Sequence, residues 1–358
     1  MKQPNGGSGD HLGRRGFLAA VAVSPLLLSG CFGGAASQGS ADTGNFPVTI
    51  PHLFGETTVT KVPTRIATLG FASQDACVEL GVVPVGVPAY EARGFGTSLW
   101  FGKAITSMNA VMPTQYREVD GPPYDSLKSL KPDLILAVNS GITRDEYDTL
   151  SKIAPVIAYP GTPFGTDWRT TTLTVGKAIG RSQAAKELVA NIEKEIAKAK
   201  SSYSDLAGSS FLYLGASSVP GADFEVYDEN SNPVRILEDF GVVPSPSLDK
   251  VKAQGKRQIV RYGVSPLLWE SRRGGELQAD IDVVAVNMSE RADIAKNGVL
   301  DVLPAAKRNS LAVVQNSDDA LALLEASPLG VKWVLWTVMP ELARAAYQAK
   351  HGSGAAGS

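Results

Sequence analysis

Few residues of this chain could carry out acid–base, nucleophilic or metal chemistry. The 358 residues include three histidines and two cysteines, and beyond residue 31 the histidines are only His52 and His351. A zinc or manganese site of the usual kind needs several imidazoles around one ion. The sequence also lacks the Gly-x-Ser-x-Gly and His-Glu-x-x-His motifs of hydrolases. We therefore predict no catalytic residues, no metal site and no cofactor, although a site of tyrosines and carboxylates would escape this count.

Cys31 is the residue best placed for covalent modification. Arg14 and Arg15 precede an apolar run, residues 17–28, which ends at Leu28-Ser29-Gly30-Cys31. The run is too short for a membrane span, which needs ~20 residues. The arrangement resembles a twin-arginine export signal followed by a lipobox. We expect residues 1–30 to be the signal peptide and Cys31 to carry the lipid, palmitate included, that anchors the protein outside the bacterial cell membrane. The alternative is an ordinary secretory signal with a chance cysteine.

Composition and charge narrow the class of protein. Residues 31–358 are long enough for two ordinary domains. The formal net charge of −2 gives no basic field that would indicate nucleic-acid binding. Cys77, in a helical pattern, is expected to be a buried small apolar residue. Residues 33–44 are rich in Gly, Ser and Ala, so residues 31–45 are predicted to be a flexible tether.

The rest of the chain alternates strand and helix, the pattern of a parallel α/β sheet. Short loops join these segments, and glycine ends several of them. Predicted strands are residues 48–50, 57–60, 66–70, 82–87, 134–138, 156–158, 211–214, 283–286 and 311–314. Predicted helices are residues 75–80, 124–130, 144–153, 234–240 and 331–349.

Residues 182–202 form the most regular helical segment. Ser182 is a plausible N-cap, and Ala185, Leu188, Val189 and Ile192 begin one apolar stripe. At ~1.5 Å per residue the helix would extend roughly 30 Å. Such a helix could connect two lobes, or it could be a crossover helix inside one larger sheet, and periodicity alone favours neither.

Several segments occur along the chain in a characteristic order. They are residues 48–55 (VTIPHLFG), 62–66 (VPTRI), 80–86 (LGVVPVG), 127–135 (LKSLKPDLI), 147–156 (YDTLSKIAPV), Trp168, 175–181 and 327–330 (SPLG). In this order they resemble the iron–siderophore substrate-binding proteins of ABC importers. The resemblance covers nearly the whole chain after Cys31 and is weakest over residues 248–280.

This resemblance implies the helical-backbone class of periplasmic binding protein. Two Rossmann-like α/β lobes would face each other across a ligand cleft, joined by a single long helix. The implied domains are an N-terminal lobe of residues 46–180, an interlobe helix of residues 181–203, a C-terminal lobe of residues 204–350 and a flexible tail of residues 351–358. The resemblance also implies a monomer without enzymatic activity.

The ligand implied by the family is a ferric siderophore, which brings its own iron ligands. The protein would supply aromatic faces and arginines, whose planar forks bond two chelate oxygens. In open α/β sheets the loops after strand ends line the ligand crevice. On that basis the candidate ligand-binding residues are Tyr90, Arg93, Trp100, Trp168, Tyr213, Arg235, Arg257 and Trp269.

Family members also carry one acidic residue on each lobe that pairs with arginines of the membrane permease. Asp125 occupies the position where the family usually has Glu. On the second lobe the corresponding residue is Glu270 or, if residues 248–280 are aligned otherwise, Glu276.

Two other functions compete with siderophore transport. The first is the binding of haem or a corrinoid in the same cleft. His52 could then be an axial haem ligand, although a structural role for it is favoured. An exported hydrolase that uses His52 or His351 is the remote one.

Overall fold

A computed structural model describes residues 45–90, 94, 96–260, 263–286, 298–314 and 317–352. The predicted signal peptide, Cys31 and nearly all of the predicted tether lie outside these residues, as does Arg93. All described residues belong to one compact unit, residues 36–358. Within it we call residues 45–180 the N-half and residues 204–352 the C-half.

The N-half is built on a five-stranded parallel sheet of order β5-β4-β3-β6-β7. The central strands β3 and β6 are buried along their whole length, which explains their continuous apolar sequence. A separate antiparallel hairpin, β1-β2, precedes the sheet. The strands are β1 (Val48–His52), β2 (Gly55–Val59), β3 (Ile66–Gly70), β4 (Gly86–Pro88), β5 (Thr114–Tyr116), β6 (Leu134–Asn139) and β7 (Val156–Ala158). The helices are α1 (Ser73–Glu79), α2 (Leu99–Ser107), α3 (Tyr124–Leu130), α4 (Arg144–Leu150) and α5 (Trp168–Ala178).

The C-half carries a mixed seven-stranded sheet of order β11-β12-β9-β8-β13-β14, with β10 also paired to β8. The β8, β13 and β14 strands are parallel, whereas β9, β12 and β11 extend the sheet in antiparallel fashion. Two strands of this antiparallel extension, β11 and β12, lie in residues 248–280, where the resemblance is weakest. The strands are β8 (Ser210–Ala216), β9 (Phe224–Tyr227), β10 (Val243–Pro244), β11 (Lys256–Arg257), β12 (Leu267–Trp269), β13 (Ile281–Val286) and β14 (Leu311–Val314).

Helices of the C-half correct one prediction from the sequence. A single helix was expected over residues 331–349, but α11 (Pro328–Thr337) and α12 (Met339–His351) are separate. Pro340 explains the break, because proline lacks an N–H and its ring clashes with the carbonyl of the preceding turn. The remaining helices are α7 (Asn232–Asp239), α8 (Ser247–Gln254), α9 (Pro304–Lys307), α10 (Ser317–Glu325) and two 3₁₀ turns, Ser204–Leu206 and Ser271–Glu276.

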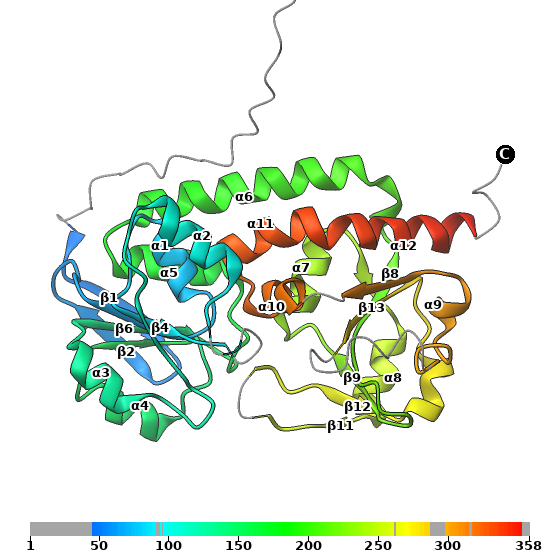
Figure 1. Cartoon of the computed structure of the whole chain (residues 1–358), viewed down its shortest axis with the longest axis horizontal. Coiled ribbons are helices and arrows are strands. Elements are labelled where there is room, and N and C mark those ends of the chain that lie inside the picture. The colour runs from blue at the N-terminus through cyan, green and yellow to red at the C-terminus, as the bar shows by residue number, and fades with distance from the viewer. Residues whose placement is uncertain are drawn as a thin grey trace, which may run out of the picture. The chain divides into compact units, whose positions relative to one another are not determined.

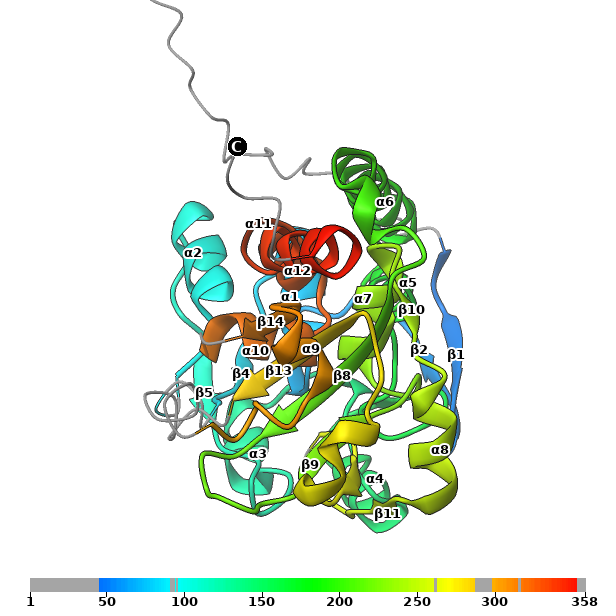
Figure 2. The same ribbon diagram turned by 90° about the vertical axis from the view of Figure 1, so that its right-hand side faces the viewer.

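The helix α6 (Ser182–Ser202) connects the two halves. It contacts α5 at the N-half and the 3₁₀ turn Ser204–Leu206 at the C-half, and α11 lies beside it. Its buried face consists of Ala185, Val189, Ile192 and Ile196, so the predicted stripe is confirmed. The predicted cap is wrong, because Arg181 occupies the N-cap position and makes no side-chain capping bond. Figures 1 and 2 show α6 and the α11–α12 pair on the same side of both sheets.

One of the four apolar clusters crosses from the N-half to the C-half. It joins Phe71, Trp100 and Trp168 of the N-half with Phe240 and Val331 of the C-half, among others. Two further clusters lie in the N-half, one of which also includes Ala185 of α6, and one lies within the C-half. The junction between the halves is therefore packed with apolar side chains and bears directly on any site formed between them.

Candidate functional site

The carboxyl ends of β3 and β6 form the N-half wall of the candidate site. Gly70 ends β3 with φ of +75°, and a Cβ there would lie 2.4 Å from the carbonyl oxygen of Asn139 at the end of β6. Only glycine permits this close approach without strain. The Phe71 amide then donates to that same carbonyl at 2.8 Å. Both strands thus deliver their following loops to one edge of the sheet.

A small hollow lies at this edge, beside the loop that follows β7. The Gly70 amide donates to Glu118 Oε2 at 2.9 Å, which places a carboxylate at the rim. The Phe164 ring packs against Gly141, where an added Cβ would lie 2.2 Å from it, and lies 5.5 Å from the Phe71 ring. The residues lining the hollow are Gly70, Glu118, Gly121, Pro122, Ser140, Gly141, Ile142 and Phe164.

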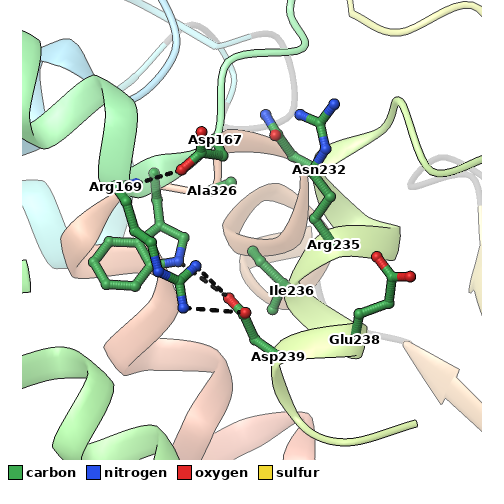
Figure 3. A pocket seen from close by; sticks show the side chains of 9 residues that line it. Asp167, Arg169, Asn232, Arg235, Ile236, Glu238, Asp239 and Ala326 are labelled. Carbon is green, nitrogen blue, oxygen red and sulfur yellow. Dashed lines mark hydrogen bonds and ion pairs between the residues drawn. The ribbon is translucent and has the colours of Figure 1, made fainter. Parts of the chain in front are cut away.

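A larger cavity of about 250 Å³ lies where α5 of the N-half meets α7 of the C-half (Figure 3). Its lining residues are Asp167, Trp168, Arg169, Asn232, Arg235, Ile236, Glu238, Asp239 and Ala326. Asp167 caps α5 by accepting from the amides of Arg169 at 2.9 Å and Thr170 at 3.1 Å. The start of α5 is therefore fixed at the cavity wall.

An ion pair closes one side of this cavity. Arg169 binds both oxygens of Asp239, at 2.9 and 3.1 Å, and Glu193 of α6 at 2.8 Å. Partial burial lowers the pKa of Arg169, but the bonds to Asp239 and Glu193 outweigh it and raise the pKa above its usual value. The Trp168 indole also donates to Asp239 Oδ2 at 3.2 Å, and its ring lies 4.5 Å from the Arg169 guanidinium. We call Arg169, Asp239 and Glu193 the surface seam.

Arg235 ties the loop after β7 to the C-half. Its guanidinium donates to the carbonyls of Gly165 and, at 3.0 Å, Glu229. Asn232 Nδ2 donates to the Phe164 carbonyl at 3.3 Å, while Asn232 Oδ1 has no hydrogen-bond partner in the described part of the chain. The same loop therefore supplies an aromatic wall to the hollow and two carbonyls to the C-half.

Two tyrosines pack together on the C-half sheet. Tyr213 on β8 and Tyr227 on β9 have ring centroids 5.4 Å apart, and the Tyr227 hydroxyl donates to Glu225 at 3.1 Å. Burial, followed by the neighbouring Glu225 charge, raises the pKa of both phenols. Both therefore remain neutral hydrogen-bonding groups.

The other C-half candidates make structural contacts. Arg257 pairs with Asp228 at 2.6 Å, and although burial raises the pKa of Asp228, this pairing and the Asn230 amide bring it below its usual value. Trp269 is 2% exposed, and the Arg273 guanidinium lies 3.9 Å from its ring centroid.

The structure distributes the predicted ligand-binding residues over several places. Trp168 and Arg235 line the same cavity. Tyr90 and Trp100 lie in the interior near α1, where Trp100 donates to Asp75 at 2.7 Å. Tyr213, Arg257 and Trp269 lie in the C-half as described above, and Arg93 lies outside the described residues. The ligand-binding roles of all eight remain predictions.

Sequence reasoning missed the acidic residues of the junction. Glu118, Asp239, Asp75 and Glu325 were not singled out. The signal available for Asp75 and Glu325 was the position of each acid within an otherwise apolar helical pattern, SQDACV and LALLEA, where a solvated charge is unexpected.

His52 lies in the β1–β2 hairpin and is buried. Its Nε2 lies 2.9 Å from Thr57 Oγ1, and its Nδ1 accepts from the Phe54 amide at 3.2 Å. Burial, and secondarily Arg144, lowers its pKa. These local bonds give His52 a structural role within the hairpin.

The acids predicted to face a permease lie on exposed surface. The Asp125 side chain on α3 is fully exposed, 3.6 Å from Lys128. Glu270 pairs with Arg272 at 2.8 Å. The alternative, Glu276, is bonded by Arg273 and Lys250, and the first of these contributes most to lowering its pKa to about 2. Glu276 is thus already engaged by two cations.

Neither a metal site nor a membrane span is found among the described residues. Across these ranges no group of three or more His, Cys, Asp and Glu side chains could hold a metal ion. In the same part of the chain, no helix has the length and apolar character needed to cross a bilayer.

Comparison with known proteins gives consistent matches. Residues 103–244 match the sequence model of a family described as periplasmic binding protein. The petrobactin-binding protein YclQ of Bacillus subtilis is 24% identical over 79% of this chain and 89% of its own length. The Fe(3+)-citrate-binding protein YfmC of the same organism is 27% identical over 50% of this chain and 55% of its own length. Across these and two further curated relatives, the matched stretch covers from 54% to 89% of the relative.

Solved structures share the fold over most of the chain. Streptococcus pneumoniae TIGR4 PiaA in complex with ferrichrome superimposes with a TM-score of 0.72 at 26% identity, covering 84% of this chain and 99% of that one. The expected α/β architecture, two sheets joined by α6, therefore agrees with solved structures.

Proposed function

We propose that this chain, a member of the periplasmic binding protein family, is the solute-binding component of an ABC importer and captures a ferric siderophore. Its relatives are named as binders of petrobactin and of ferric citrate, and a neighbour of similar fold was crystallised with ferrichrome. These ligands share one chemistry, an iron ion wrapped in organic oxygen donors. Because such a chelate brings its own iron ligands, the protein has only to supply shape, rings and hydrogen-bond donors.

The observation that carries this proposal is the meeting of Arg235 with the loop that bears Phe164. A guanidinium and an aromatic ring stand there at the junction of the two halves, beside the carboxyl ends of β3 and β6. This is the edge of an α/β sheet at which ligands ordinarily bind. The planar guanidinium can exchange its carbonyl partners for two chelate oxygens, and the exchange would favour a bound ligand.

We further propose that Cys31 carries the lipid anchor after export. The 14 residues between Cys31 and Phe46 would then hold the folded unit near the membrane surface. Asp125 and Glu270 would dock to the permease, with Glu276 as the weaker candidate because two cations already bind it. Exposed pairs of this kind contribute little affinity, ~0–1 kcal/mol each, and act mainly by orienting the encounter.

Tryptophan fluorescence quenching tests the proposed ligand class. The chain is titrated with ferric hydroxamate, ferric catecholate, ferric citrate and haem, and with the iron-free chelators. We expect saturable quenching by at least one ferric chelate and weaker quenching by its iron-free form. Tight quenching by haem without any response to the ferric chelates would overturn the proposal.

Two arginine variants test the position of the site. Arg235→Ala should weaken binding of the responding chelate while the melting temperature stays within a few degrees of the parent. Arg272→Ala, whose side chain is 80% exposed, is the control and should leave binding unchanged. Equal affinity of the two variants would place the site elsewhere.

A further inference from the structure

Two fully buried acids face each other across the junction between the halves. Asp75 lies on α1 of the N-half and Glu325 ends α10 of the C-half, and both are 0% exposed. Gln74 Nε2 donates to Glu325 Oε1 at 3.0 Å, and Ser327, two residues beyond Glu325, donates to Asp75 Oδ2. Each half therefore reaches across to the acid of the other.

Every hydrogen-bond donor that the described residues supply to these acids is neutral. The Trp100 indole donates to Asp75 Oδ2 at 2.7 Å, and Gln74 Nε2 also bonds the Tyr90 hydroxyl at 2.5 Å. Asp75 Oδ1 and Glu325 Oε2 have no hydrogen-bond partner among the described residues. We call Asp75, Glu325 and these donors the buried seam.

Charged groups around the buried seam do not neutralise it. Glu79 on α1 adds a further negative charge, but Lys332 of α11 pairs with it at 2.7 Å. Lys103 of α2 lies 5.4 Å from the Trp333 ring, and that ring packs on Trp100 at 5.6 Å. The Cys77 thiol, whose pKa burial raises, is neutral. Lys332 and Lys103 are thus engaged by other groups.

Two ionised carboxylates in such an interior would each lose their hydration and would repel each other. Burial raises the pKa of Asp75 to about 7, against the lowering by Ser327 and Trp100. Burial and then the Asp75 charge raise the pKa of Glu325 well above its usual value, although bonds from Tyr90, Gln74 and Trp100 oppose this. Because the two acids interact, the proton affinity of each depends on the protonation state of the other.

We infer that Asp75 and Glu325 form a protonated pair across the junction, and that this neutral pair positions the two walls of the candidate site. The two acids are positioning residues, because neither lines the hollow or the cavity. When Asp75 loses its proton to solvent, an unneutralised carboxylate remains in a dry interior, and loss of the Glu325 proton at higher pH leaves two like charges on opposite halves. Separation of the halves, or entry of water between them, relieves this desolvation and repulsion.

The buried seam is connected to both walls by very short paths. Asp75 lies five residues after Gly70, which lines the hollow, and Glu325 directly precedes Ala326, which lines the cavity. Asn139 Nδ2 donates to the backbone carbonyl of Glu325 at 3.4 Å, and the Asn139 carbonyl receives the Phe71 amide. A shift of either acid therefore moves residues at the site.

The first test follows the Trp100 indole N–H by NMR as pH is raised, with the resonance assigned by its loss in Trp100→Phe. We expect it to shift with a midpoint near pH 7. The shift should be lost in Asp75→Asn and displaced to lower pH in Glu325→Gln. It should persist in Asp282→Asn, which alters a buried acid within the C-half sheet alone. A Trp100 resonance that does not titrate between pH 5 and pH 9 in the parent chain would overturn the inference, and this outcome does not require either acid variant to fold.

The second test measures affinity for a ferric chelate over the same pH range and rests on the proposed function. Above the midpoint, affinity should fall by up to about tenfold per pH unit in the parent chain and stay flat in Glu325→Gln. An affinity profile that is the same in both proteins would refute the positioning role even if Trp100 titrates. Failure of every chelate to bind would instead count against the proposed function, because the NMR result does not depend on a ligand.

Discussion

The two seams between the halves use opposite electrostatics. In the surface seam, Arg169 meets the carboxylates of Asp239 and Glu193, and the arginine and Asp239 side chains are 32% and 23% exposed. In the buried seam, Asp75 and Glu325 have the same sign of charge when ionised and are fully buried. One contact attracts through water-accessible charges, and the other persists only while it holds a proton.

This difference predicts different responses to the medium. Salt screens a partly exposed ion pair, whereas a buried group is screened much less. Proton loss near neutral pH alters the carboxyl pair of the buried seam, whose pKa values are raised, whereas Arg169, whose pKa is also raised, keeps its charge there. The buried seam should therefore respond to pH, and the surface seam to ionic strength.

Loss of the Trp100 ring should have the largest effect on stability. Trp100 is 5% exposed and is both a hydrogen-bond donor to Asp75 and part of the apolar cluster that crosses the halves. Trp100→Ala should lower the free energy of unfolding by about 3–5 kcal/mol, as for other buried aromatic residues. Chemical denaturation measures this. Trp336→Ala, at a ring that is 74% exposed, is the control and should cost ~0.5 kcal/mol or less. Similar losses in both variants would mean that the junction does not depend on Trp100.

The pH dependence of stability should change next most strongly when Asp75 is neutralised. A raised pKa means that the folded chain binds more protons than the unfolded chain, so this contribution is full below the unfolded value near 3.8 and is lost as pH rises toward about 7. Its slope is ~1.4 kcal/mol per pH unit for one proton. The difference profile between the parent chain and Asp75→Asn should show this fall.

The profile of Asp75→Asn must be subtracted from that of the parent chain because other carboxyl groups change the free energy of unfolding with pH in the opposite direction. Asp133 and Asp228, for example, have lowered pKa values and favour folding as pH rises. Arg169→Gln is the matched control at the surface seam, and its difference profile should be flat around pH 7. A flat profile for Asp75→Asn would remove the contrast between the seams.

The surface seam should show a smaller, salt-sensitive effect. A double-mutant cycle of Arg169→Gln and Asp239→Asn should give a coupling of ~0.2–1 kcal/mol at low salt, since the groups are partly exposed. The coupling should diminish between about 0.1 M and about 1 M salt, where the screening length falls from ~10 Å to ~3 Å. A coupling that is insensitive to salt but varies around pH 7 would show that the two seams behave alike.

The sequence predicted the architecture well because each element carries its own local signal. The strands β3 and β6 read as unbroken apolar runs, α6 as one apolar stripe, and the end of α1 as a helix followed by Gly81 at φ of +77°. The break between α11 and α12 was missed although Pro340 marks it, because the apolar pattern continues through the proline.

The site was less predictable because it depends on pairings between distant residues. Asp75 and Ser327 are separated by 252 positions, and Arg235 and Gly165 by 70. An arginine or a tryptophan in a loop after a strand has the same local pattern whether it faces a ligand or packs inward. In the structure Trp168 and Arg235 line the same cavity, whereas Trp100 packs at the buried seam. No local feature of the sequence distinguishes these two outcomes.

Asp125 lies away from both seams and should have the smallest effect on the folded chain. Its side chain is fully exposed beside Lys128, so Asp125→Ala should change the free energy of unfolding by ~0.5 kcal/mol or less and leave chelate affinity unaltered. If Asp125 docks to the permease, the variant should nevertheless lower iron uptake in cells that depend on this protein. Asp145→Ala, at an exposed acid on α4 of the same half, should leave uptake at the parental level. Equal uptake by the two variants would rule out a docking role for Asp125, and a loss of chelate binding in Asp125→Ala would show that this surface charge is coupled to the junction after all.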